Sequence, residues 1–180
     1  MYKYLLYFLI FSFSGWCVEV GYHVIKLGKF ENRGLAWGPF CPIYGVGICL
    51  SSLLLSRVDS FILTALLSMA IATAVELFVG FFTDRLLSLR LWDYSGEKGN
   101  ILGYVCPRFS FAWGIACALV IKLLPLLDPL ISWLYAPLFK GAAFMIFILI
   151  LVDVRVSMLE AGMGRKSALS IKNAHNSLQK

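Results

Sequence analysis

The chain has 180 residues, of which 60% are hydrophobic and 14% are charged, and its mean hydropathy is +0.82. Soluble domains contain about 45–50% apolar and roughly 25% charged residues, so this composition excludes a chain that folds in water. The formal net charge is +6, but the basic residues lie between apolar stretches. They therefore indicate membrane topology and contact with anionic lipid headgroups, not nucleic acid binding.

Apolar windows of suitable length predict an all-α integral membrane protein with about five transmembrane helices in one bundle. In chain order the predicted helices cover residues 4–23, 42–56, 61–83, 107–124 and 138–158. They form a single domain over residues 1–160, followed by a basic cytoplasmic tail over 161–180. The first helix runs on without a small-residue cleavage pattern, which favours a retained span over a signal peptide.

Trp133 and Tyr135, between the last two spans, suit the membrane interface, and Pro125, Pro129 and Pro137 are expected to break the helical stretches there. The cysteines lie in or beside spans, and their odd number favours free thiols over a disulfide framework. They are Cys17, Cys41, Cys49, Cys106 and Cys117.

Lysine and arginine counts predict the orientation. With the C-terminus in the cytoplasm and the N-terminus outside, the inner segments hold 12 of the 16 basic residues and the outer segments hold 4. This asymmetry favours N-out, C-in, and the assignment fails if one helix is re-entrant. Whether the polar segment 84–103 enters the bilayer is left open by the sequence.

Two halves of the chain resemble each other in the order of their residues. Glu19 and Asn32 precede Gly38–Pro42, and Glu76 and Asn100 precede a second Gly-x-x-Cys-Pro at 103–107. The pattern predicts a parallel two-helix repeat plus a fifth helix, and a chance match of short motifs is the alternative.

Glu19 and Glu76 are the sharpest candidates for function. A carboxylate within a span costs a few kcal/mol on insertion scales (about 2.5–3.5), so each is expected to face the bundle interior. Their presence favours a polar cavity on the cytoplasmic side that binds a cation, a proton or a polar substrate. The alternative is that each carboxylate only bonds a helix end or a loop arginine. His23 lies one turn after Glu19, but the spacing matches no standard metal site.

The two helix starts at Pro42 and Pro107 aim free N–H groups forward, and Arg33 and Arg108 add charge nearby. They could hold an anionic group, or they could be ordinary helix starts with interfacial arginines. The loops around Asn32 and over 92–95 are expected to close the cavity.

The residues predicted to bind a substrate or ion are Glu19, His23, Asn32, Arg33, Glu76, Asp93, Asn100 and Arg108. No metal or cofactor is predicted. Because no phosphate-binding Gly-x-x-x-x-Gly-Lys-Ser/Thr loop is present, any ATP hydrolysis would need a separate subunit.

Several motifs together resemble one family. They are Phe13–Glu19, Asn32–Gly34, Gly38–Gly45, Glu76, Trp92–Ser95, and Asn100 with Gly103. With them the chain resembles the small bacterial membrane proteins catalogued as putative ABC transporter permeases of "type IV", the CmpB-like family. The resemblance implies a multi-pass protein of the bacterial plasma membrane that acts as a transporter subunit.

The sequence thus favours a transport component over two alternatives, a membrane enzyme acting on a lipid or lipid-linked substrate and a non-catalytic regulatory or assembly subunit. The expected partners are membrane lipids and either a separate ATPase subunit or further copies of the chain. No nucleic acid partner is expected.

Overall fold

The structure is a computed structural model that describes residues 1–28, 30 and 37–178, with side chains described except at 26, 27 and 161–178. The helices are α1 (Tyr2–Leu27), α2 (Pro42–Leu55), α3 (Phe61–Leu87), α4 (Pro107–Leu130) and α5 (Pro137–Leu178), with a short 3₁₀ helix η1 (Ser132–Tyr135) between the last two. The prediction of an all-helical chain with five main helices is confirmed, and the described part contains no β-strand.

Four helices are long and apolar enough to cross a membrane: α1, α3, α4 and the part of α5 up to Glu160. The exception is α2, which has only 14 residues. At 1.5 Å per residue it is about 21 Å long, shorter than the roughly 30 Å of a bilayer's hydrocarbon core. The chain is therefore a multi-pass membrane protein in which α2 is a short helix among longer spans.

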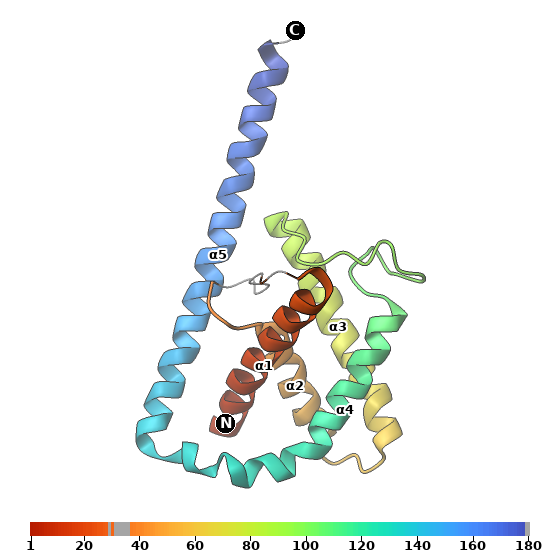
Figure 1. Cartoon of the computed structure of the whole chain (residues 1–180), viewed down its shortest axis with the longest axis vertical. Helices are drawn as coiled ribbons and strands as arrows, with labels where there is room; N and C mark the ends of the chain where they lie inside the picture. The colour runs from red at the N-terminus through yellow and green to blue at the C-terminus, as the bar shows by residue number, and fades with distance from the viewer. Residues whose placement is uncertain (29, 31–36, 179–180) are drawn as a thin grey trace.

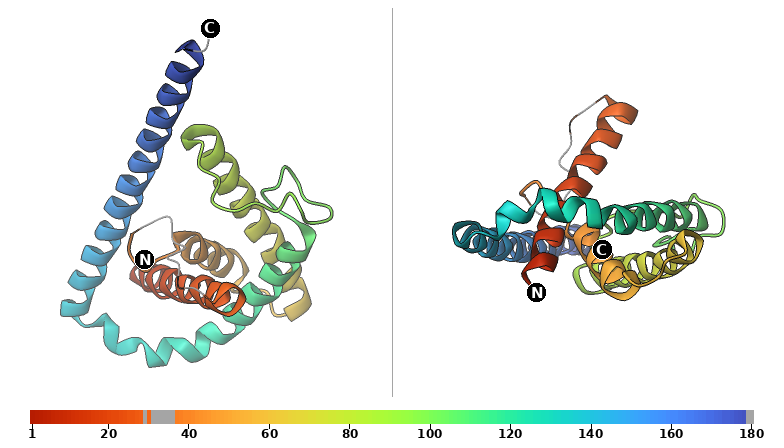
Figure 2. Two further views of the ribbon diagram at one scale, coloured as in Figure 1. Left: turned by 45° about the horizontal axis from the view of Figure 1, so that its top comes forward. Right: turned by 90° about the horizontal axis from the view of Figure 1, so that it is seen from below.

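Successive helices alternate in direction. In Figure 1 the N-terminus, the turn between α2 and α3, and η1 lie toward the bottom, while the connection from α3 to α4 lies at the upper end of the group formed by α1 to α4. The α3–α4 and α1–α2 hairpins adjoin each other, and α5 contacts α1 and, less extensively, α3, but stands apart from α4 (Figures 1 and 2). Which end faces the cytoplasm stays a prediction.

Prolines start two helices as the sequence predicts. Pro42 and Pro107 occupy the first turn of α2 and α4, where the missing N–H costs nothing. Ser60 caps α3 by accepting a hydrogen bond from Leu63 N at 3.3 Å. Gly28, at φ 66°, ends α1 in the left-handed conformation that favours glycine.

The region after residue 124 differs from the prediction. Pro125 and Pro129 lie inside α4, which continues to Leu130 and turns aside at the bottom of Figure 1. Proline removes one backbone hydrogen bond and bends a helix, and here the helix bends without ending. The last helix is also longer than expected, because α5 continues to Leu178.

Close backbone contact joins the two helices within each hairpin. A Cβ at Gly45 of α2 would lie 2.6 Å from the backbone oxygen of Phe8 on α1, and one at Gly114 of α4 would lie 2.7 Å from that of Ala65 on α3. Small residues allow this approach, as is typical of transmembrane helix pairs. Near the N-terminus, Lys3 and Tyr7 of α1 bind the carboxylate of Asp128 on α4.

Candidate functional site

Glu76 lies in the middle of α3, on the face that is buried against the other helices. Its side chain is only 6% exposed. Its Oε1 accepts hydrogen bonds from Trp113 Nε1 at 2.9 Å and from the Tyr94 hydroxyl at 3.4 Å. Its Oε2 is buried and has no hydrogen-bond partner among the described residues. The carboxylate is therefore bonded on one oxygen and unsatisfied on the other.

Glu19 lies on α1 and is half-buried. It accepts a hydrogen bond of 2.5 Å from the hydroxyl of Tyr44 on α2. The ring of Tyr44 meets that of Trp113 edge to face, with the ring centroids 4.6 Å apart. One chain of contacts thus joins the two glutamates through two aromatic side chains.

We call this set the carboxylate–aromatic cluster; its members are Glu19, Tyr44, Glu76, Tyr94 and Trp113. They come from α1, α2, α3, α4 and the segment between α3 and α4. The side chains of a helix point toward its N-terminus, so Trp113 reaches back along α4 to the level of Glu76. A Cβ at Gly15 would lie 2.2 Å from Tyr44 Cγ, so the tyrosine ring can occupy this position only because residue 15 has no side chain.

The segment between α3 and α4 is folded by its own hydrogen bonds. Tyr94 N donates to Gly103 O at 2.8 Å, and Trp92 Nε1 donates to Tyr104 O at 2.7 Å. Gly103 has φ 74°, a conformation that favours glycine. The fold of this segment holds the Tyr94 ring on Phe109, at a centroid distance of 4.8 Å.

Tyr94 stays a neutral hydrogen-bond donor. Burial raises the pKa of its hydroxyl, and the nearby carboxylates of Glu76 and Glu19 raise it further. An O–H group that remains protonated can donate to Glu76 throughout the physiological range.

Asp93 and Asn100, both predicted site residues, bond within the same segment and not to the glutamates. Asp93 pairs with Arg90 at 2.9 Å and accepts from Ser95 N, a bond that lowers the pKa of the Asp93 carboxyl. The Asn100 amide donates to two carbonyls and accepts from Gly103 N. Both residues therefore shape the segment that carries Tyr94.

Two of the remaining predicted residues, Arg108 and His23, lie within the part of the chain that the structure describes. Arg108 bonds Glu97 at 3.3 Å, and His23 lies on α1 with its ring 5.8 Å from that of Tyr22. Asn32 and Arg33 lie outside the described residues. Among the described residues, Arg108 pairs with Glu97 and has no bond to Glu76.

The cysteines at the two helix starts are buried thiols. Burial, assisted by the charge of Glu19, raises the pKa of Cys41 to about 12, so it stays protonated and is a poor nucleophile. Cys106 is 1% exposed. The described residues include no group of three histidine, cysteine or acidic side chains placed to hold a metal ion.

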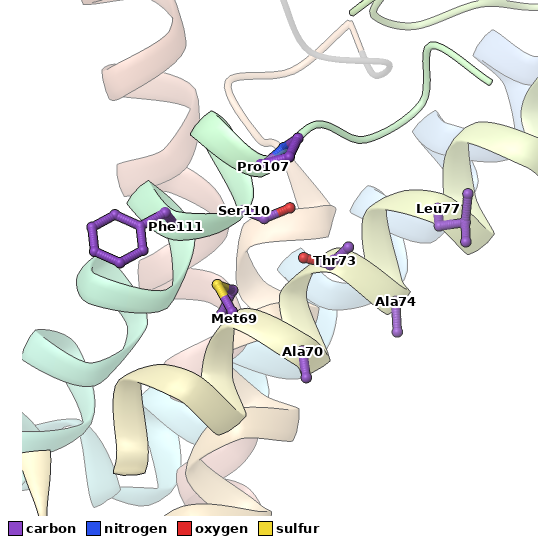
Figure 3. A pocket seen from close by; sticks show the side chains of 8 residues that line it. All are labelled: Met69, Ala70, Thr73, Ala74, Leu77, Pro107, Ser110 and Phe111. Atoms are coloured by element: carbon purple, nitrogen blue, oxygen red, sulfur yellow. The ribbon is translucent and has the colours of Figure 1, made fainter. Parts of the chain in front are cut away.

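A groove of about 550 Å³ lies between α3 and α4 (Figure 3). Its lining is mostly apolar and carries two hydroxyls. It consists of Met69, Ala70, Thr73, Ala74, Leu77, Pro107, Ser110 and Phe111. In Figure 3 the Thr73 and Ser110 side chains lie between the two helices, whereas Phe111 points outward.

Tyr44 and Trp113 were missed by reasoning from sequence. Each is an aromatic residue in an apolar helix, a setting in which packing is the ordinary role. The usable signal was Gly45 beside Tyr44, together with Gly15 on α1, because small residues at facing positions predict close helix contact.

Comparison with known proteins gives one match. A family model described as "Putative ABC-transporter type IV" matches residues 6–158. No curated protein and no solved structure matches the chain. The matching family and the four long apolar helices fit a component of a membrane transporter.

Proposed function

Because the chain belongs to the family described as putative ABC-transporter type IV, we propose that it is a membrane subunit of a transporter. In this proposal the carboxylate–aromatic cluster binds the transported solute. We place the protein in the bacterial plasma membrane, as the family resemblance implies.

The observation that carries the proposal is the linkage of the two intramembrane glutamates. Glu19 and Glu76 are held in one network by Tyr44 and Trp113, which lie on two further helices. Ionisable groups within a membrane are costly and usually mark a substrate or ion pathway. A site built from four helices would also respond to any movement of one hairpin against the other, as alternating access requires.

The chemistry of the cluster favours a ligand that donates hydrogen bonds or carries positive charge. Its own donors, Tyr44, Tyr94 and Trp113, already serve the carboxylates. What remains is acceptor capacity, including Glu76 Oε2, which has no partner in the part of the chain that the structure describes. An anionic ligand finds less support, since Arg108 is engaged by Glu97.

A separate subunit would supply energy from ATP. The chain contains no phosphate-binding loop of the Walker type. The 42-residue helix α5 continues well beyond the stretch that would span the membrane. We propose that this extension lies on the cytoplasmic side, where a separate ATPase subunit or a second copy of the chain would bind the protein.

The experiment compares the wild-type protein with Glu19→Gln and Glu76→Gln after affinity purification from native membranes in mild detergent. Mass spectrometry then identifies bound small molecules and co-purifying proteins. We expect a solute to co-purify with the wild-type protein. Its occupancy should fall about tenfold or more in each variant, because each variant loses a hydrogen bond between the solute and a charged carboxylate. Asp59→Asn, in an exposed turn, is the control.

Equal occupancy in all three proteins would rule out binding by the cluster. An ATPase present in near-stoichiometric amount would support the transporter assignment. Turnover of a lipid headgroup by the purified protein alone would instead favour the membrane enzyme.

A further inference from the structure

We propose that the α3–α4 groove is a lateral binding site for an alkylammonium ligand that comes from the membrane. The ammonium group would bind at Glu76, Thr73 and Ser110, and the alkyl chain would lie in the groove. This inference rests on the proposed function and assigns a class of ligand and a route to the same site.

The groove has the size and the position that such a ligand needs. Small-molecule sites usually have volumes of about 300–1,000 Å³, and this groove has about 550 Å³. It is formed by α3 and α4, both of which are long enough to span the membrane. Phe111 on its rim is 61% exposed, so the opening faces outward from the bundle. The surroundings of that opening are therefore lipid.

The lining separates an apolar wall from a polar floor. Most of the lining is apolar, including Met69 and the two alanines at 70 and 74. The polar atoms belong to Thr73 and Ser110, whose side chains lie between the helices in Figure 3. Thr73 Oγ1 is buried and has no hydrogen-bond partner among the described residues.

Glu76 lies outside the lining residues but next to this polar floor. It follows Thr73 by three residues on α3, and residues at this spacing are neighbours on a helix. Trp113, which binds Glu76, follows Ser110 by the same spacing on α4. The two hydroxyls therefore lie one helical turn from the Glu76–Trp113 bond, and they connect the groove to the cluster.

An alkylammonium matches these groups in charge and in donor number. An ammonium has three N–H donors and no acceptor. Thr73 Oγ1 and Ser110 Oγ in the lining, with Glu76 Oε2 one helical turn beyond them, supply three acceptors. Glu76 is more than nine-tenths buried, so a cation there would satisfy an otherwise expensive group. The face of Trp113 or Tyr94 could add a cation–π contribution.

The test uses the full chain in nanodiscs and titrates it with dodecylammonium by calorimetry, with empty nanodiscs as the blank. We expect saturable binding that is about tenfold weaker for dodecyltrimethylammonium, which has the same charge and chain but no N–H donor. Ethylammonium, which lacks the chain, should bind at least tenfold more weakly. No saturable binding above the blank, or equal binding of all three, would overturn the proposal.

Variants locate the ligand. Ala74→Leu fills the groove, Thr73→Val removes a hydroxyl at nearly constant volume, and Glu76→Gln removes the charge. Each should weaken dodecylammonium binding several-fold or more, whereas Ala116→Leu, at an exposed position of α4 outside the lining, should not. Unchanged affinity in Ala74→Leu and Thr73→Val would refute the groove.

The variants also separate this inference from the proposed function. If Glu76→Gln alone loses its solute, the cluster is a solute site without a lateral groove. If Ala74→Leu instead changes the oligomeric state, the groove holds a helix of a second copy. Ala70 and Ala74 are small residues four positions apart, a spacing that also suits the packing of transmembrane helices. That result would overturn the ligand assignment.

Discussion

Tyr44 links the α1–α2 hairpin to the rest of the cluster. Its hydroxyl binds Glu19, and its ring contacts Trp113. Tyr44→Phe keeps the ring and removes the donor. Since a hydrogen bond to a charged group contributes about 1.5–3 kcal/mol, we expect the free energy of unfolding to fall by an amount in this range. Titration with SDS of the purified protein measures it.

A double-mutant cycle tests whether that loss belongs to the Glu19–Tyr44 bond. Tyr44→Phe combined with Glu19→Gln should cost less than the sum of the two single changes, because both remove the same interaction. Tyr4→Phe, in α1 outside the cluster, is the control for losing a tyrosine hydroxyl. Strict additivity would show that the hydroxyl and the carboxylate are not coupled.

At the level of single residues, the sequence identified charges better than it identified their partners. Glu19 and Glu76 stand out because carboxylates are rare in spans. Their partners lie 25 and 37 positions away along the chain, and helical periodicity relates only residues within one helix. Which aromatic side chain meets which carboxylate depends on how the hairpins pack, and no spacing in the sequence encodes that.

The contact between α1 and α2 depends on Gly45. A Cβ at this position would lie 2.3 Å from Ser12 Oγ and 2.6 Å from the backbone oxygen of Phe8. The side chain could turn away, but the backbone could not. Gly45→Ala should therefore force the helices apart and lower the free energy of unfolding by about 1–3 kcal/mol.

Gly47 is the matched control, two residues further along α2. A Cβ there meets nothing within 4 Å, and alanine favours a helix over glycine by about 0.5–1 kcal/mol. Gly47→Ala should leave stability unchanged or raise it, as SDS titration of both variants would show. Equal losses in the two variants would mean that contact with α1 does not explain the effect, because helix propensity alone favours alanine.

Asn100 holds the segment between α3 and α4 in shape. Its amide donates to Ser95 O at 3.2 Å and Glu97 O at 2.8 Å, and its Oδ1 accepts from Gly103 N at 3.0 Å. Asn100→Ala removes all three bonds, so we expect faster amide hydrogen exchange over residues 94–105. Exposed Lys98, changed to alanine, is the control. Unchanged exchange in Asn100→Ala would show that the segment is held by other contacts.

At the level of elements, helix starts were easier to predict than helix ends. Proline at the first turn marks where α2 and α4 begin, because it suits that position and few others in a helix. The same residue misled the prediction at 125 and 129, where the helix bends and continues. A break and a bend share one sequence signal, and the surrounding packing decides between them.

At the scale of the whole molecule, the order and number of helices follow from apolar length, but their neighbours do not. The separation of α5 from α4 is seen only in the structure (Figure 2). Asp153 connects α5 to the segment before α2, because its carboxylate accepts hydrogen bonds from the backbone N–H groups of Trp37 and Gly38. Because the apolar spans are similar in composition, their sequences do not indicate which helices become neighbours.

The alternating helices predict which segments share a side of the membrane. Asp59 in the turn after α2 and Ala136 after η1 lie at one end of the bundle, and Gly96 lies at the other (Figure 1). Lysine and arginine counts place the first two outside the cell. Cysteines introduced at these positions in a Cys17→Ser background report the topology through a membrane-impermeant maleimide.

In intact cells we expect labelling of Asp59→Cys and Ala136→Cys, and labelling of Gly96→Cys only after permeabilisation. The reverse pattern would invert the predicted orientation and leave the fold intact. Labelling of Asp59→Cys and Gly96→Cys from the same side would mean that α3 does not cross the membrane. That result would contradict the expectation that α3, an apolar helix of 27 residues, spans the membrane. It would also place Glu76 outside the bilayer. The carboxylate would then not carry the energetic cost that makes it a candidate for function.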